Sequence, residues 1–269
     1  MNRFGLIFKH YLKRNFKTME NIGAMLLLPI GIILLFAFIN DYQLADDEYR
    51  NAIFRGYNLL HTGLVISNML FFQVFGLFFS MENLHESMKT PAKWRLMAAP
   101  INRFVYPAAS ILASWVVTIA SGVIVVIVTS VVLNVYWGNM FINILALLGI
   151  SLFAQALGVI IFLITKTVGQ GNAIAYPLSF FIGGLSGFII PIRDFLDNGF
   201  TEFLERWSPL NLAIDSIRHG GSFGTAHLVT GLYSGGNMTY AMQNILYLFA
   251  IAIGLSLMAF VIGKVKKAW

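Results

Sequence analysis

The sequence predicts an all-α protein that crosses a membrane six times, as a single domain over residues 1–269. Three observations predict this class. Hydrophobic residues make up 58% of the chain and charged residues only 11%, a balance far from that of soluble domains. The mean hydropathy is +0.74. Six apolar stretches are each long enough to cross the bilayer's hydrocarbon, which is about 30 Å thick and needs roughly 20 helical residues.

The charges between the predicted spans indicate their orientation. The spans lie at 22–39, 59–81, 107–133, 141–164, 173–192 and 241–263. With the amino terminus inside, 13 of the 18 Lys and Arg residues fall in inner segments. Because positive charge gathers on the cytoplasmic side, both termini are predicted to be cytoplasmic and the protein to lie in the cell membrane. The high sequence pI therefore indicates orientation, and nucleic-acid binding is not expected.

Residues 1–20 predict a helix that lies in the inner membrane interface. Apolar side chains recur at helical spacing, at Phe4, Phe8, Tyr11, Leu12, Phe16 and Met19. Lys9, Lys13 and Lys17 line another face at intervals of four. Such a helix places its rings among lipid headgroups and its lysines toward anionic lipid. The alternative is a basic flank that only follows the charge rule for membrane orientation.

The first four spans contain features of packing and of a possible pathway. Pro29 and Gly31 predict a kink in the first span, because proline removes a backbone donor. The acidic run at 46–48 predicts a solvated loop, since no further calcium ligands occur at a recognisable spacing. The amides of Asn68 and Gln155 suit bonds between helices, with substrate contact as the alternative. Together with Gln73 they are pathway candidates.

Residues 82–106 form the longest charged interruption on the predicted inner face. Their pattern predicts a short helix with one apolar and one polar side, which can dock on a soluble partner. The apolar side contains Leu84, Met88, Trp94, Leu96 and Met97, and the charged residues are Glu82, Glu86, Lys89, Lys93 and Arg95.

Residues 94–103, WRLMAAPINR, resemble the coupling segment of ABC-2 type transporter permeases. In that family a run of small residues with Leu leads to Pro and a nearby Arg before the third span. The resemblance implies docking of an ATPase on Glu86, Lys89, Trp94, Arg95 and Leu96, with Pro100 and Arg103 setting the turn into the third span. Upstream, where the family often has Arg-Glu and Gly-Thr, this chain has ENLHES at 82–87, which leaves the docking register open.

The same resemblance implies the protein's architecture and partners. It implies an N-terminal elbow helix, the cytoplasmic coupling helix and short outer helices before the last span. It also implies a cytoplasmic ABC ATPase and a second permease, identical or homologous. The outer segment at 193–240 begins with alternating aromatic and charged residues, which also fit short interfacial helices.

The fifth predicted span is interrupted by proline and glycine. Pro177 and Pro191 lie near its ends, with three glycines between them. A kink or re-entrant break is tolerated in a membrane only where freed backbone groups face protein or water, which places this span near the pathway. Its aromatic residues, Tyr176, Phe180, Phe181 and Phe188, are the remaining pathway candidates.

The energy for transport is expected to come from another subunit. No charged residue lies inside a predicted span, whereas ion-coupled carriers usually hold their ion on an intramembrane carboxylate. The chain has no G-x-x-x-x-G-K-[ST] motif for ATP phosphates. The chain is therefore predicted not to be an enzyme and to bind no cofactor, with ATP and Mg on the partner ATPase.

The predicted function is export of an amphipathic or hydrophobic substrate, such as a drug, antibiotic, peptide or lipid-like molecule, with multidrug or antibiotic resistance as the expected role. The alternatives are an ion-independent carrier and a non-transporting membrane scaffold. A remoter one is an intramembrane serine protease, suggested by GLSG at 184–187. Such an enzyme needs a histidine in the following span, and the predicted sixth span has none. The dispersed histidines show no metal-ligand spacing.

Overall fold

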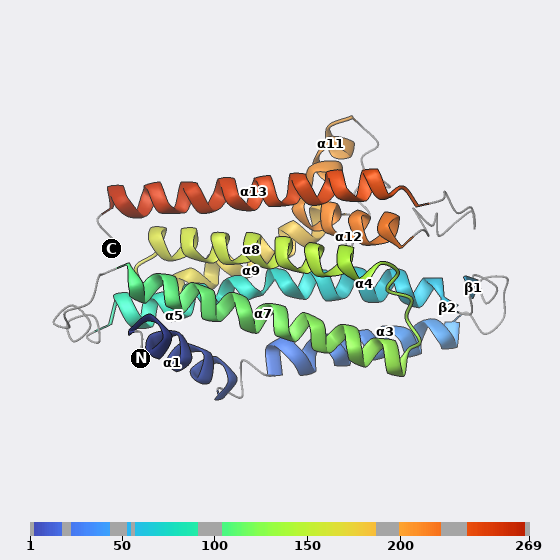
Figure 1. Cartoon of the computed structure of the whole chain (residues 1–269), viewed down its shortest axis with the longest axis horizontal. Coiled ribbons are helices and arrows are strands. Elements are labelled where there is room, and N and C mark those ends of the chain that lie inside the picture. Colours follow the sequence, from blue (N-terminus) through green and yellow to red (C-terminus); the bar gives the residue numbers. More distant parts are fainter. Residues whose placement is uncertain are drawn as a thin grey trace.

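A computed structural model describes residues 3–17, 23–43, 53–54, 57–90, 104–186, 199–221 and 236–266. Helices dominate this part of the chain, and the long ones lie side by side in one bundle (Figure 1). The amino terminus, the end of α5 and the end of α13 share one end of the bundle, and β1 and β2 lie at the opposite end (Figure 1). The all-α class and the multi-pass membrane character predicted from the sequence are confirmed.

The elements, in chain order, are α1 (Arg3–Lys17), the π-helix η1 (Gly23–Leu27), α3 (Leu28–Gln43), β1 (Ile53–Phe54), β2 (Tyr57–Asn58), α4 (Leu59–Val74), α5 (Gly76–Met88), α7 (Val105–Val132), α8 (Met140–Ile164), α9 (Val168–Leu185), α11 (Gly199–Trp207), α12 (Pro209–Gly220) and α13 (Met238–Val265). The two short strands pair antiparallel, with Ile53 opposite Asn58.

Within the described residues, four helices are long and apolar enough to cross a membrane. They are Thr62–Met88, which joins α4 and α5, and the helices α7, α8 and α13. These correspond to the second, third, fourth and sixth predicted spans. The first predicted span coincides with η1 and α3, where the apolar α-helix Leu28–Ile39 is shorter than a membrane span requires. The fifth coincides with α9, where polar residues in the first turns lower the hydropathy. The count of six therefore stays a prediction.

The span formed by α4 and α5 contains a break that the sequence did not predict. At Phe75 the helix bonds tighten, with the Phe75 amide donating to the Phe72 carbonyl at 3.2 Å and the Phe78 amide to the Phe75 carbonyl at 3.1 Å. Bonds of this i to i−3 type are those of a 3₁₀ turn. No proline lies in this span, so the pattern of the sequence does not predict the break.

Helix α8 packs directly on the backbone of α5. A Cβ atom at Gly158 would lie 2.1 Å from the Ser80 Oγ and 2.3 Å from the Leu77 carbonyl oxygen. The Ser80 hydroxyl donates to the carbonyls of Leu77, at 3.1 Å, and Gln155, at 3.3 Å. Small residues permit this close approach of two membrane helices. The absence of a side chain at Gly158 therefore allows the short distance between α5 and α8 at the centre of the bundle.

The structure corrects the prediction of a separate helix at 82–88 and describes part of the predicted fifth span. Residues 82–88 are the last two turns of α5 and do not begin a separate helix, because Leu84 and Met81 are fully buried and hold these turns in the bundle. Helix α9 runs through Pro177 to Leu185 without interruption, so the described part of the fifth span contains no re-entrant break. Residues 187–198 lie outside the described residues.

Helices α11 and α12 occupy the segment where short outer helices were predicted. Helix α12 lies alongside α8 and α13 (Figure 1), with Leu210, Ala213 and Ile217 buried. At its end, Gly221 meets Gly138, which has φ +60° and where a Cβ atom would lie 2.2 Å from the Gly221 Cα. Helix α12 is therefore packed into the bundle, whereas a helix lying on a membrane interface was predicted for this segment.

Candidate coupling site and pathway

The end of α5 is joined to α1 by a charged contact. The Arg14 Nη1 lies 2.7 Å from the Glu86 Oε2, and these side chains are 31% and 57% exposed. The Arg14 Nη2 donates to the Asn83 Oδ1, and the guanidinium lies 5.0 Å from the Tyr11 ring centroid. Glu86, a predicted docking residue, therefore contacts the N-terminal helix of its own chain. The exposed pair itself contributes at most about 1 kcal/mol.

Asn83 connects three helices through its amide. Its Nδ2 donates to the Asn15 Oδ1 of α1, at 3.0 Å, and to the Ser114 Oγ of α7, at 2.8 Å. Both amide hydrogens and the Oδ1 of Asn83 thus have partners, and the three residues are buried. Because buried polar groups without partners are costly, this network fixes α1 and α7 against the end of α5.

The pattern of the sequence does not predict this network. Its members lie 68 and 31 positions apart in the chain, so no local spacing connects them. The signal that existed was one asparagine on each of two predicted helices, Asn15 and Asn83, since amide side chains can form hydrogen bonds between helices.

Lys89, another predicted docking residue, caps the end of α8. Its ammonium donates to the carbonyls of Phe162 and Thr165 and lies 4.3 Å from the Phe162 ring centroid. Lys266 donates to the Leu163 carbonyl at 3.0 Å. Cations suit a helix C-terminus because its last carbonyls lack helical partners. Burial, with a smaller contribution from Lys266, lowers the pKa of Lys89.

The other predicted docking residues lie outside the described residues. They are Trp94, Arg95, Leu96, Pro100 and Arg103. Their role in docking stays a prediction.

Three of the pathway candidates, Asn68, Gln73 and Gln155, are buried within the chain. The Gln155 Nε2 donates to the Gly76 carbonyl and to the Thr118 Oγ1, each at 3.2 Å, and Gln155 is 1% exposed. It therefore bonds the backbone beside the break at Phe75 and ties α8 to α7. The Gln73 side chain packs so closely on α7 that a Cβ atom at Gly122 would lie 2.8 Å from its Nε2. These contacts favour helix packing over substrate binding.

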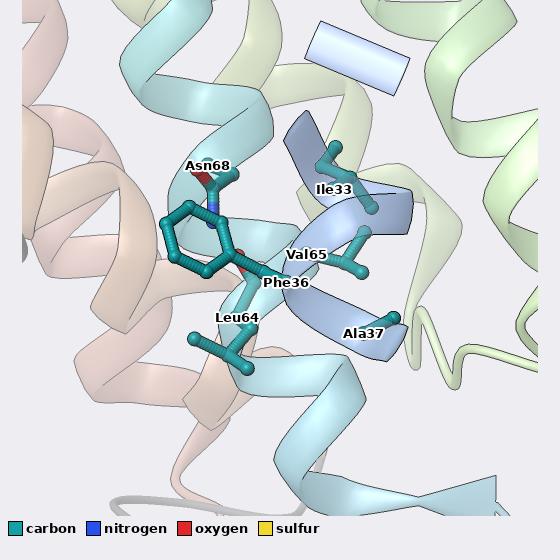
Figure 2. Close-up of a pocket in the computed structure, with 6 residues that line it drawn as sticks. All are labelled: Ile33, Phe36, Ala37, Leu64, Val65 and Asn68. Atoms are coloured by element: carbon teal, nitrogen blue, oxygen red, sulfur yellow. The ribbon is translucent and has the colours of Figure 1, made fainter. Parts of the chain in front are cut away.

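Asn68 lines a shallow hollow between α3 and α4. Figure 2 shows its side chain next to the Phe36 ring, with Ile33 and Val65 nearby. The Asn68 Nδ2 donates to the Leu64 carbonyl at 2.9 Å, and the residue is 3% exposed. Its amide is therefore engaged within its own helix.

The aromatic candidates of α9 form a row with the phenylalanines of α4 and α5. Tyr176 and Phe78 have ring centroids 4.5 Å apart, and Phe180 lies 6.0 Å from Phe71 and 6.1 Å from Phe75. Tyr176 is 52% exposed and Phe180 54%. Large aromatic side chains exposed together are typical of surfaces that meet a ligand, a partner or lipid.

Two further pathway candidates were predicted on the same span. Phe181 is 61% exposed, and Phe188 lies outside the described residues. Among the described residues, no group of three acidic or histidine side chains is placed to hold a metal ion.

Most of the chain matches a protein-family model. A family described as ABC-2 type transporter matches residues 2–220, which is most of the chain and includes α1 to α12. No curated protein matches the chain.

Proposed function

The chain belongs to the ABC-2 type transporter family as a multi-pass membrane permease, and from this premise we propose that it is the permease subunit of an ATP-driven exporter. The observation that supports coupling to a partner is the polar network at the end of α5. There Asn83 and Glu86 join the segment at 82–106 to α1, and Asn83 also joins it to α7. A force applied to this segment would reach two further helices directly.

In the proposed architecture the chain crosses the membrane six times. Helix η1 with α3 supplies the first crossing, and α9, continued by residues up to 192, supplies the fifth. Helix α1 is the elbow helix, since it is amphipathic and packs on α7 with Tyr11 and Asn15 buried. Residues 82–106 are the coupling segment, with α5 supplying its first turns.

The proposed partners are a cytoplasmic ABC ATPase and a second permease, identical or homologous. The ATPase holds the ATP and Mg, because this chain has no phosphate-binding loop. Closure of the two ATPases moves the coupling segments, and the Asn83 network transmits the motion to α1 and α7. The gap between the two permeases then changes its opening.

The pathway is proposed to follow the exposed aromatic row of Tyr176, Phe180 and Phe181. More than half of each of these side chains is exposed, so a second permease placed opposite would cover the exposed part. An enclosed aromatic surface without charge suits an amphipathic or apolar substrate, such as a drug, antibiotic, peptide or lipid-like molecule. Gln73, Gln155 and Asn68 support the helices behind this surface.

Docking is tested by reversing charge in the coupling segment. In the double variant Lys93→Glu, Arg95→Glu, we expect ATPase co-purification and permease-stimulated ATP hydrolysis to fall by about tenfold, as for loss of an interfacial hot spot. Lys89 is left unchanged because it caps α8.

The matched control is Lys166→Glu, an exposed charge on the predicted inner face outside the coupling segment. It should leave both readouts unchanged. If the double variant also retained full co-purification and hydrolysis, the docking assignment would be wrong. A chain that never associates with an ATPase would point to a carrier or scaffold.

A further inference from the structure

A groove lies between α1, the end of α5 and the start of α7. It has a volume of about 310 Å³, and its walls include Leu6, Ile7, His10, Arg14, Glu86 and Tyr106. The groove is at the end of the bundle that the charge distribution predicts to be cytoplasmic, level with the last turns of a membrane span. From this position we expect the groove to lie level with the lipid headgroups of the inner face.

The walls of the groove differ in polarity. Leu6 and Ile7 supply apolar surface, and Leu6 is 49% exposed. Arg14 and His10 supply donors on the same helix, since they follow at intervals of three and four residues from Ile7. Burial raises the pKa of Tyr11, so its hydroxyl in the same wall stays protonated. The groove thus matches a molecule with a charged head and an apolar tail.

The charge around the groove favours an anion. Helix α1 carries five Lys and Arg residues and no acid. Of the described acidic residues, only Glu86 lines the groove, and the Arg14 guanidinium is its ion-pair partner. The remaining basic residues of α1, such as Lys9 and Lys13, leave the surroundings positive. Positive surfaces at this depth attract the anionic lipids of the inner leaflet.

The volume indicates which part of a lipid enters. Pockets for drug-sized ligands span roughly 300–1,000 Å³, so this groove is at the small end. A headgroup fits, and the acyl chains have to remain in the bilayer. We propose that the groove binds the phosphate headgroup of one anionic phospholipid, with Arg14 and His10 as donors and the start of its chains along Leu6 and Ile7.

Binding is measured on the purified full-length chain by native mass spectrometry, with phosphatidylglycerol or phosphatidylcholine added in detergent micelles. We expect one phosphatidylglycerol to be retained in preference to phosphatidylcholine. Arg14→Gln should weaken retention about tenfold, the usual effect of losing a charge-assisted hydrogen bond. The control Lys13→Gln removes the same charge from an exposed position on the same helix that does not line the groove, and should weaken retention much less than Arg14→Gln does.

Ile7→Trp supplies a second variant that fills the groove and leaves the Arg14 contacts in place. It should abolish retention, so the site is tested even if Arg14→Gln does not fold. Equal retention of both lipids would show no preference for an anionic headgroup, and equal losses in Arg14→Gln and Lys13→Gln would show attraction by general surface charge. Either result would overturn the site. Displacement by inorganic phosphate alone would show an anion site and overturn the lipid. Neither ATPase nor transport is needed, so the result stands apart from the proposed function.

Discussion

Gly158→Ala is expected to destabilise the folded chain by about 3 kcal/mol, the upper part of the usual range for overpacking. The new methyl group would meet the Leu77 carbonyl at 2.3 Å and the Ser80 Oγ at 2.1 Å. Ser80 can turn away, but the Leu77 carbonyl is backbone and can move only with α5. Helices α5 and α8 would have to separate at the centre of the bundle, which should appear as a large drop in the thermal unfolding midpoint in detergent.

Gly254→Ala is the matched control for this substitution. Gly254 lies inside α13, and nothing is within 4 Å of a Cβ atom placed there. This alanine should be neutral or stabilise the helix by up to about 1 kcal/mol. Equal unfolding midpoints for the two variants would mean that α8 does not approach α5 as closely as described.

Asn83→Leu is expected to cost about 3 kcal/mol and to loosen α1 from the bundle. The Asn15 Oδ1 and Ser114 Oγ would lose their donor, and the Arg14 Nη2 its acceptor. Each buried polar group left without a partner costs roughly 1–3 kcal/mol. Thermal unfolding measures the loss, and proteolysis at the lysines of α1 measures its release.

Glu86→Gln, one turn away on the same helix, provides the comparison. It weakens an ion pair whose carboxylate side chain is 57% exposed, and should change stability by less than about 1 kcal/mol. If the two substitutions had similar effects on unfolding and proteolysis, the buried amide would not hold the three helices together.

Features carried by long runs of sequence were predictable, and features made by contacts between distant segments were not. The apolar runs that became α7, α8 and α13 predicted those spans to within a few residues. The amphipathic pattern at 1–20 likewise predicted α1. The break at Phe75 was not predicted, because no proline marks it in the sequence. It is supported from another helix by the Gln155 side chain, which donates to the Gly76 carbonyl.

At the candidate coupling site, too, the residues could be predicted from the sequence but their contacts within the chain could not. Charge pattern and resemblance selected Glu86 and Lys89, yet their partners, Arg14 and the end of α8, are 72 or more positions away in the chain. Such pairings depend on how α1 and α8 pack, which no local spacing reveals. Residues 94–103, which carry the resemblance, lie outside the described residues, so their part in docking rests on sequence.

The most direct test of a cytoplasmic coupling segment is the side from which it can be labelled. The chain has no cysteine, so a single Thr90→Cys substitution at the end of α5 can be labelled alone by a membrane-impermeant maleimide in sealed vesicles. Met238→Cys, at the start of α13, marks the opposite end of the bundle. If the coupling segment is cytoplasmic, Thr90→Cys reacts only from the cytoplasmic side, more slowly with ATPase bound, and Met238→Cys reacts only from outside. Labelling of Thr90→Cys from outside would contradict it, because no cytoplasmic ATPase could then reach the segment.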